Sequence, residues 1–272
     1  REHEFQMGWL RPSKFTQEID PMKTTLLVLS LNEIEGMKRM MVQIEPRWCD
    51  QILVVDGGST DGTIEYARDQ GYEVLVQVKP GLMNAYREAY SHIQGDIVIP
   101  FSPDGNSPAE VIPRLIEKME EGYDMVIASR YLPGAHSDDD TPITALGNWV
   151  FTRLINLLFG GHYTDAMVMY RAFKTPLYLE LGLLVDRYLE RKLSETICII
   201  PLMSMRAAKK KLRLGEIPGD EPARIGGAGK CRHFVWGSIY LAQMLQEFLF
   251  WDSPVGETPV VSGEKKKTRS IS

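Results

Sequence analysis

The feature that most constrains the fold of this chain is a regular alternation of short apolar runs with segments of helical periodicity between residues 24 and 129. Apolar runs of this length predict buried strands, and apolar residues three or four positions apart predict helices. Because strands that alternate with helices form a sheet covered on both faces, the pattern predicts an α/β fold with a mostly parallel, Rossmann-like central sheet. Strands are expected at 24–31, 51–55, 73–78, 96–101 and 125–129, and helices at 32–44, 84–92, 109–121 and from the turn at 57–62 through 68.

The pattern is less regular after residue 130. Helices are expected at 147–159 and 177–192, and strands at 166–173 and 196–203. In the first of these helices, Trp149, Leu154 and Leu157 are expected to face inward. The last apolar stretch, 234–251, contains Gln243, Gln246 and Glu247, and these polar positions favour an amphipathic helix over a membrane span.

These elements define one main domain with an appended helix. We expect an N-terminal extension at 1–22, the main domain at 23–232, the amphipathic C-terminal helix at 233–251 and a disordered tail at 252–272. The formal net charge of -5 disfavours nucleic acid as a partner. The three cysteines form no CxxC pair and the first residues carry no apolar leader, so we expect a cytoplasmic protein with reduced thiols.

A turn rich in glycine and aspartate, residues 56–62, follows the second expected strand. Asp56 at a strand end can accept hydrogen bonds from a nucleobase or a ribose, and the glycines let the backbone approach a ligand closely. The alternative is an ordinary strand-to-helix turn in which Asp61 lies near the helix N-terminus.

A second polar cluster follows the fourth expected strand. If the backbone there is extended, Ser102, Asp104 and Asn106 point the same way. Their oxygens are of the kind that Mg²⁺ or Mn²⁺ prefers, and because only one is a carboxylate, donor phosphates must supply much of the ligation. The alternative is a Pro/Gly turn with Ser107 as the cap of the next helix, and both interpretations are compatible.

Several short motifs occur together in one order: 30–33, 55–63, 79–81 with Ala85, 95–96, Asp104 with 108–110, 129–131, 164–165 with 170–173, and Arg224 with Gly227 and Lys230. In this order and spacing, over roughly residues 24–240, the chain resembles family 2 glycosyltransferases of the GT-A fold. The likeness is closest to polyprenyl-phosphate (dolichol-phosphate) mannose or glucose synthases. The resemblance implies an inverting, metal-assisted transfer of a sugar from a UDP- or GDP-sugar, with polyprenyl phosphate or a small molecule as acceptor.

The resemblance also implies roles for individual residues. Asp104 and Asn106 would bind the metal, and Arg130 would face phosphate groups and act in catalysis together with Asp104 and Asp165. Donor-binding positions would be Ser30, Asn32, Glu33, Asp56, Lys79, Gly81, Asp104 and Lys230. A phosphate acceptor needs no general base, whereas a hydroxyl acceptor does, and Asp165 and Asp186 are the candidates.

The chain departs from the family pattern at both ends of the expected site. Gly57 and Ser102 stand where the family has carboxylates, Asn148 stands where the synthases have an arginine for the lipid phosphate, with Arg153 as a substitute, and 168–171 carries large apolar side chains. A soluble hydroxyl acceptor, a sugar nucleotidyltransferase and a silent binding module therefore remain alternatives. A nucleotidyltransferase would show a Gly- and basic-rich loop, which 29–36 lacks.

The basic run 209–211 and the 234–251 segment suggest two kinds of partner. Lysines can meet lipid headgroups, so peripheral contact at the inner face of a membrane is one hypothesis. The aromatic residues of 234–251 could instead form the surface of a homodimer.

Overall fold

The computed structural model describes residues 22–185, 198–225 and 233–251, with side chains of the last segment from residue 237. Its centre is a seven-stranded sheet in the order β3-β2-β1-β4-β6-β5-β7, in which only β6 runs antiparallel to its neighbours. The strands are β1 (Thr24–Ser30), β2 (Gln51–Asp56), β3 (Glu73–Val76), β4 (Ile97–Phe101), β5 (Met125–Ser129), β6 (Arg171–Lys174) and β7 (Leu214–Pro218). The predicted mostly parallel α/β architecture is confirmed.

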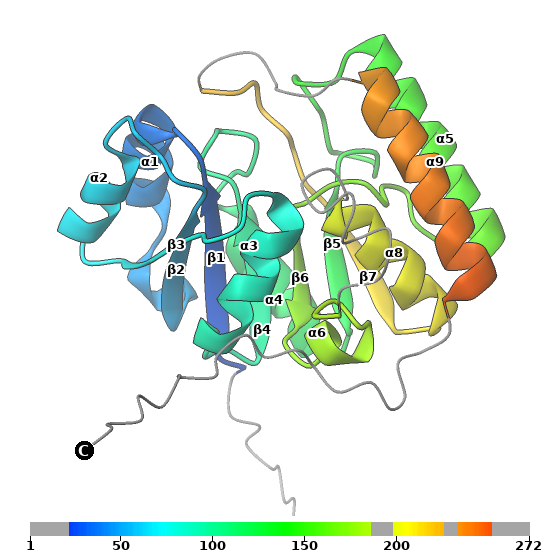
Figure 1. The fold of residues 1–272 in the computed structure, drawn as a ribbon, viewed down its shortest axis with the longest axis horizontal. Coiled ribbons are helices and arrows are strands. Elements are labelled where there is room, and N and C mark those ends of the chain that lie inside the picture. Colours follow the sequence, from blue (N-terminus) through cyan, green and yellow to red (C-terminus); the bar gives the residue numbers. More distant parts are fainter. Residues whose placement is uncertain (1–21, 186–197, 226–232, 252–272) are drawn as a thin grey trace, which may run out of the picture.

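Helices cover the sheet and both of its ends. They are α1 (Ile34–Met40), α2 (Thr63–Asp69), α3 (Leu82–Ala89), α4 (Val111–Glu120), α5 (Pro142–Phe159), α6 (Leu177–Glu180), α8 (Ile199–Lys209) and α9 (His233–Phe250). Single 3₁₀ turns occupy Met41–Gln43, Pro46–Trp48 and Tyr90–His92. In Figure 1, α1 and α2 pack at the β3 end of the sheet, and α5 and α9 lie side by side at the β7 end.

The buried strands explain why the sheet forms. Every residue of β4 and β5 is buried, and β1 is buried except for one half-buried position, as expected for strands covered on both faces. The parallel register brings Ser30 at the end of β1 opposite Asp56 at the end of β2. Polar residues at these carboxyl ends therefore collect along one edge of the sheet.

The predicted strand at 196–203 is wrong, because most of this run is the first part of helix α8. Every residue from Ile199 to Ala208 is buried, so the run shows no amphipathic periodicity and looks like a buried strand. Pro201 is tolerated because it lies in the first turn, where its missing N–H has no helical partner. The following strand, β7, was not predicted, since its glycine and proline are typical of a turn.

The helix predicted at 147–159 begins at Pro142, after a capping box between Thr141 and Thr144. The prediction that Trp149 and Leu157 face inward is wrong, because they are 57% and 80% exposed. The buried positions of α5 are Asn148, Thr152, Ile155 and Phe159. The helix is apolar on its outer side, so apolar residues did not mark its inner face.

The other elements end close to their predicted bounds or lie partly outside the described residues. The strand predicted at 166–173 is confined to Arg171–Lys174, and α6 begins at the predicted Leu177 but is helical only to Glu180. The predicted extension, the tail and the end of the 177–192 helix lie outside the described residues. Among the helices in the described ranges, none combines the length and the apolar character of a membrane span.

Candidate functional site

The candidate site lies where β1, β2, β4 and β5 end, at the carboxyl edge of the sheet. Ser30, Asp56 and Ser129 close three of these strands, and the 102–106 turn follows the fourth. Carboxyl ends of parallel strands are where α/β folds bind ligands. The structure thus brings together the polar motifs that the sequence singled out after these strands.

Two loops are joined at the β1–β2 end of this edge. Asn32 is in the left-handed region (φ 55°), its backbone N–H donates to Ser59 Oγ at 2.7 Å, and its Oδ1 accepts from the Thr60 N–H at 2.9 Å. Glu33 N–H donates to Thr63 Oγ1 at 3.1 Å. The loops after β1 and β2 therefore form one unit, and the predicted contacts of Asn32 and Glu33 with the nucleotide stay predictions.

Asp61 links the starts of two helices. Its carboxylate accepts from the backbone N–H groups of Ile34 in α1 and Thr63 in α2, at 3.1 and 3.0 Å. Burial alone would raise the pKa of Asp61, but the hydrogen bonds from Thr63 and Ile34 outweigh it and lower the pKa below its ordinary value. This agrees with the alternative interpretation of this turn, in which Asp61 lies near the helix N-terminus.

Asp56 is fully buried and already satisfied by the protein. Its Oδ1 accepts from the Gly58 and Ser59 N–H groups at 2.9 and 2.6 Å, and its Oδ2 accepts from the Ser30 and Ser59 hydroxyls at 2.8 and 2.6 Å. A carboxylate has about four acceptor positions, and all are used here. Asp56 holds the turn in shape, and its predicted contact with the nucleoside stays a prediction.

Lys79 and Gly81 lie in the loop between β3 and α3. The Gln77 side chain donates to both of their carbonyl oxygens, at 3.0 and 3.1 Å. Glu88 accepts from the Lys79 N–H at 2.9 Å, and the Lys79 residue is exposed. These bonds fix the backbone from which the Lys79 side chain extends into solvent.

The backbone at 102–106 is a turn, so the predicted extended geometry is wrong. Gly105 has φ 98°, a conformation that glycine adopts without strain. The buried Asp104 carboxylate accepts from the Asn106 N–H at 3.1 Å and pairs with Arg224, while the Asn106 amide donates to Pro222 O at 2.7 Å. Asp104 and Asn106 therefore both face protein groups.

As arranged, these residues do not fit a divalent cation. Such an ion needs several oxygen ligands that converge on one point, and here the turn offers a single carboxylate, Asp104, which is already paired with Arg224 and bonded to the Asn106 N–H. The Asn106 amide nitrogen donates to Pro222 O. Across 22–185, 198–225 and 233–251, no group of three or more His, Cys, Asp or Glu residues could hold a metal ion. The turn lacks the convergent ligands that a resident metal requires.

A segment that we call the strap, residues 219–225, lies across the site. Its Ile225 N–H donates to Asp104 O at 2.7 Å, and its Gly219 N–H donates to Ser129 O at 3.0 Å. Glu221 is bonded to the loop after β5, through its N–H to His136 O at 2.9 Å and its carboxylate to Ser137 Oγ at 2.6 Å. The strap thus ties the 102–106 turn to the 130–141 loop.

Arg130 and Asp165, both predicted to be catalytic, form a two-point ion pair. Arg130 Nε and Nη2 donate to Asp165 Oδ2 and Oδ1 at 2.7 and 3.1 Å, and Nη1 donates to Glu221 at 2.9 Å. Asp140 lies 3.9 Å from the same guanidinium. Burial would lower the pKa of Arg130, but the bonds and charges of Asp165 and Glu221 outweigh it and raise that pKa.

The Asp165 carboxylate is fully buried, with both oxygens bonded to the guanidinium. A general base must reach the proton that it removes. This geometry favours a role for Asp165 in positioning Arg130. Its predicted role as a base is left as a prediction, and Asp186 and Lys230 lie outside the described residues.

Asn148 is buried on the inner face of α5, with its amide close to the Tyr131 hydroxyl. Arg153, the proposed substitute for the missing arginine, is exposed and stacks on Trp149 with its guanidinium 5.8 Å from the ring centre. Arg153 therefore lies on the solvent side of α5, away from Asn148.

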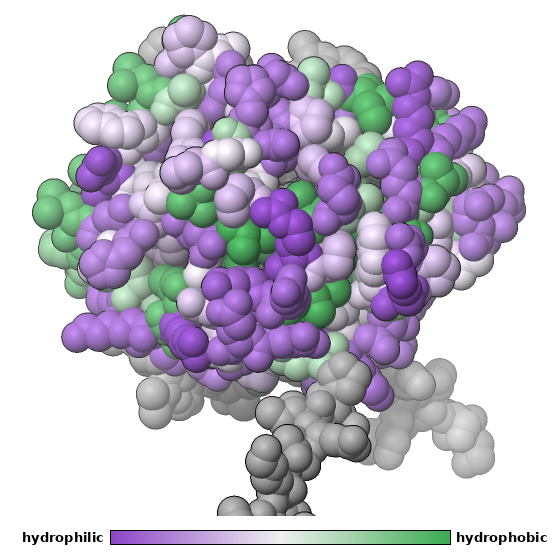
Figure 2. Space-filling model, turned by 180° about the vertical axis from the view of Figure 1, so that it is seen from behind, coloured by the Kyte–Doolittle hydropathy of each residue, from purple (hydrophilic) through white to green (hydrophobic). Residues whose placement is uncertain are grey.

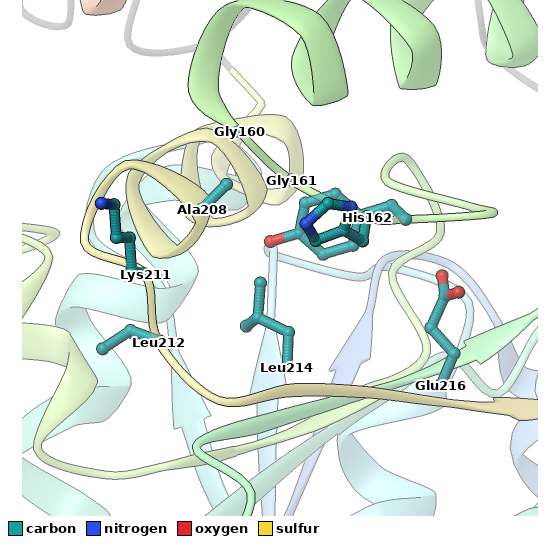
Figure 3. Close-up of a pocket in the computed structure, with 9 residues that line it drawn as sticks. Gly160, Gly161, His162, Ala208, Lys211, Leu212, Leu214 and Glu216 are labelled. Atoms are coloured by element: carbon teal, nitrogen blue, oxygen red, sulfur yellow. The ribbon is translucent and has the colours of Figure 1, made fainter.

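A cavity of about 450 Å³ lies beside the site, between the loop after α5, the end of α8 and β7. Figure 3 shows Lys211 and Glu216 at opposite sides of it, with His162 between them. The Glu216 carboxylate accepts from the Thr164 and Asp165 N–H groups at 2.9 and 3.2 Å, while burial raises its pKa. The cavity is separate from the strand-end residues predicted as the donor site.

Three residues that contact the predicted site residues were not assigned roles from the sequence. They are Arg224, which pairs with Asp104, and Glu221 and Asp140, which lie at the Arg130 guanidinium. Arg224 belongs to one of the short motifs on which the family resemblance rests. That motif was the only sequence signal that could have marked Arg224 as a site residue. The contact of Arg224 with Asp104 joins residues 120 positions apart, so it depends on the path of the strap, which no local pattern encodes.

Residues 45–182 match the model of "Glycosyl transferase family 2". Glycosyltransferase AglJ of Haloferax volcanii is 33% identical over 172 residues, covering 62% of this chain and 55% of that protein. An undecaprenyl-phosphate 4-deoxy-4-formamido-L-arabinose transferase of Enterobacter sp. is 29% identical over 187 residues, covering 66% and 52%. The chain spans about half the length of these curated relatives.

Solved structures agree on the fold. Glucosyl-3-phosphoglycerate synthase from Mycobacterium tuberculosis, in complex with phosphoglyceric acid, has a TM-score of 0.60 at 18% identity, covering 88% of this chain and 85% of that one. The same enzyme with Mn²⁺, UDP and phosphoglyceric acid has a TM-score of 0.59, covering 85% and 80%. The fold described above is therefore of the GT-A type that the resemblance implied.

Proposed function

Because this chain belongs to glycosyl transferase family 2, we propose that it transfers a sugar from a UDP- or GDP-sugar to a polyprenyl phosphate, with inversion at the anomeric carbon. The donor would bind along the carboxyl edge of the sheet, between the joined loops after β1 and β2 and the 102–106 turn. Relatives named for transfer to undecaprenyl phosphate, and for dolichol-phosphate mannosyl transfer in Pyrococcus furiosus, support this choice of acceptor.

The main structural support for a polyprenyl phosphate acceptor is the apolar outer face of α5, a helix that begins next to the site. Tyr131, next to Arg130, hydrogen bonds to Asp140 just before the α5 cap at Thr141. From there Ile143, Leu146 and Trp149 are all more than half exposed. A lipid chain could lie along these side chains while its phosphate reaches the edge of the sheet.

The proposed reaction needs no general base. A phosphate oxygen of the acceptor attacks the anomeric carbon, and the bond from that carbon to the donor diphosphate breaks with the electron pair leaving on the diphosphate. The attacking oxygen carries no proton, so the burial of Asp165 is compatible with this chemistry. Arg130, held by Asp165 and Glu221, would fix the 130–141 loop beside the reacting groups.

A second candidate is transfer to a hydroxyl group of a soluble acceptor. It is favoured by the carboxylates of Asp140 and Glu221, which are 15% and 16% exposed beside Arg130 and outnumber the positive charge there. A carboxylate in this position could accept the hydroxyl proton. The acceptor experiment below separates the two candidates.

We also propose that the protein works at the cytoplasmic face of a membrane, in peripheral contact through α5 and α9. On the α5 and α9 side of the molecule, at the left of Figure 2, apolar side chains reach the surface among polar ones. From residue 237 onward, the exposed large apolar residues of α9 are Leu241, Leu245, Phe248, Leu249 and Phe250. Self-association through the same flank is the competing hypothesis.

The test is a transfer assay with the full chain and radiolabelled UDP-glucose or GDP-mannose. Each donor is offered a short polyprenyl phosphate, the matching polyprenol without phosphate, or 3-phosphoglycerate. We expect an organic-soluble labelled product only with the polyprenyl phosphate. Transfer to 3-phosphoglycerate or to the polyprenol alone would support the hydroxyl candidate, and no transfer with any sugar-nucleotide would contradict the proposed function.

A further inference from the structure

We infer that Arg224 supplies the positive charge for the donor diphosphate at Asp104, so that nucleotide-sugar binding by this chain does not depend on a divalent cation. The inference rests on the proposed function, because it concerns the same donor. It departs from the expectation for the fold, since solved structures of the glucosyl-3-phosphoglycerate synthase contain Mn²⁺ or Mg²⁺ with UDP.

Arg224 lies at the turn after β4, where the proposed donor diphosphate would need a positive charge. Its Nη2 bonds to Asp104 Oδ2, on the turn that follows β4, and its side chain remains 30% exposed. A guanidinium has five N–H donors, and within the part of the chain that the structure describes only this one is engaged. Among the described residues the other donors have no partner, and guanidinium groups can bind phosphate oxygens in pairs.

The strap holds Arg224 in this position before any ligand binds. Backbone bonds fix both of its ends, from Gly219 to Ser129 and from Ile225 to Asp104, and the Asn106 amide holds Pro222 between them. At Gly105 a β-carbon would lie 2.8 Å from Ile225 Cγ1, so the strap packs directly on the turn. A cation held in advance loses little side-chain entropy when the donor arrives.

The residues around Asp104 provide few oxygen ligands for a divalent ion. Ser102 after β4 and Gly57 after β2 carry no carboxylate, and the Asn106 amide nitrogen donates to Pro222 O. A metal at Asp104 would have to displace a paired guanidinium and would gain one carboxylate. Arg224 already pairs with that carboxylate, so a metal at Asp104 would bring a second positive charge next to the guanidinium.

The experiment is calorimetric titration of the full chain with UDP-glucose and GDP-mannose, each in EDTA and in millimolar Mn²⁺. For the donor that binds, we expect dissociation constants in the two conditions to agree within about threefold. Arg224→Ala should weaken binding in EDTA by roughly tenfold or more, the effect of losing charged hydrogen bonds. Added Mn²⁺ should restore part of this loss, because Asp104 is then free for the metal.

Two further variants keep the result interpretable. Arg224→Lys retains the charge without the paired donors and should fall between wild type and Arg224→Ala. Arg114→Ala removes an exposed arginine of α4 and should bind as wild type does. Thermal unfolding of each variant shows whether it is folded, and Arg224→Lys tests the inference if Arg224→Ala is not.

The inference is overturned if wild-type binding weakens more than about tenfold in EDTA, or if Arg224→Ala binds as wild type does in EDTA. It is also overturned if Mn²⁺ alone binds the wild type, seen as loss of the free-ion electron paramagnetic resonance signal, and Asp104→Asn abolishes this. Absence of binding in both conditions would contradict the proposed function itself, so the two failures are distinguishable.

Discussion

Asp165 and Arg130 illustrate how a single buried contact changes the role that a residue can have. A carboxylate at this position could be a base, yet its two oxygens face the Arg130 guanidinium at 2.7 and 3.1 Å and no part of it is exposed. An arginine–carboxylate pair with two parallel bonds fixes orientation as well as charge. The geometry therefore favours a role for Asp165 in positioning Arg130.

We predict that Asp165→Asn lowers kcat with the active acceptor by about ten- to a hundredfold, because one of the two bonds to Arg130 is lost. The acidic limb of the pH–rate profile should stay where it is, since no essential base has been removed. The measurement is kcat and kcat/KM of wild type and variant from about pH 5 to pH 9. The pKa of a general base tuned for catalysis is expected to fall in this range.

Asp69→Asn, an exposed change on α2, is the matched control and should behave as wild type. Glu221→Gln, which removes the charge of the other close carboxylate on Arg130, should have a smaller effect than Asp165→Asn because Glu221 is partly exposed. Loss of the acidic limb together with a drop of about 10⁴-fold would instead assign the general base to Asp165.

At the level of elements, the sequence predicted the helices and strands that have a clear local hydrophobic pattern. It missed those whose residues are all buried by tertiary packing. The five strands from 24 to 129 were predicted because each is an apolar run bounded by turns, and the polar ends placed Asp56 and Asp104 at one edge. Helix α8 was mistaken for a strand because tertiary packing buries every residue from Ile199 to Ala208. The contact of Arg224 with Asp104 depends on the strap and has no local signal.

The packing of α8 on α9 contains a buried ion pair that the sequence did not predict. Arg206 Nε and Nη2 donate to Glu247 Oε2 and Oε1, both at 2.8 Å, and the two side chains are 0% and 2% exposed. The same guanidinium donates to Leu181 O and Gly182 O at 2.8 and 3.1 Å. This pair therefore joins α9 to the main domain.

Glu247→Ala is predicted to destabilise the protein by about 3–5 kcal/mol, because it leaves the Arg206 charge buried and unpaired. The measurement is thermal and urea-induced unfolding, with a loss in melting temperature on the order of ten degrees expected for a chain of this size. Gln246→Ala, at the neighbouring position on α9, should change stability by less than about 1 kcal/mol.

The double variant Arg206→Met with Glu247→Leu removes both charges and should recover much of the lost stability. A Glu247→Ala protein as stable as wild type would mean that α9 does not pack on α8 as described.

At the scale of the whole molecule, the chain presents an apolar flank that continues from the candidate site. Helices α5 and α9 pack side by side at the β7 end of the sheet (Figure 1). Their 36 residues include few whose side chains are charged or titrate near pH 7, namely Arg153, Glu247 and His233, and Glu247 is buried. A flank so poor in charge is unusual on a surface that faces only water.

We predict that this flank binds lipid membranes and that Leu146→Glu with Trp149→Glu abolishes the binding. Each of these side chains is more than half exposed, and burying one in lipid contributes about 1.5–3 kcal/mol, so the double change should lower the partition coefficient by more than roughly tenfold. The measurement is co-sedimentation with vesicles of phosphatidylethanolamine and phosphatidylglycerol.

Val78→Glu is the matched control, because Val78 is 88% exposed on the loop before α3, away from this flank. If the wild type does not sediment but forms a dimer in light scattering that the double variant loses, the flank is a protein interface and the membrane hypothesis is wrong.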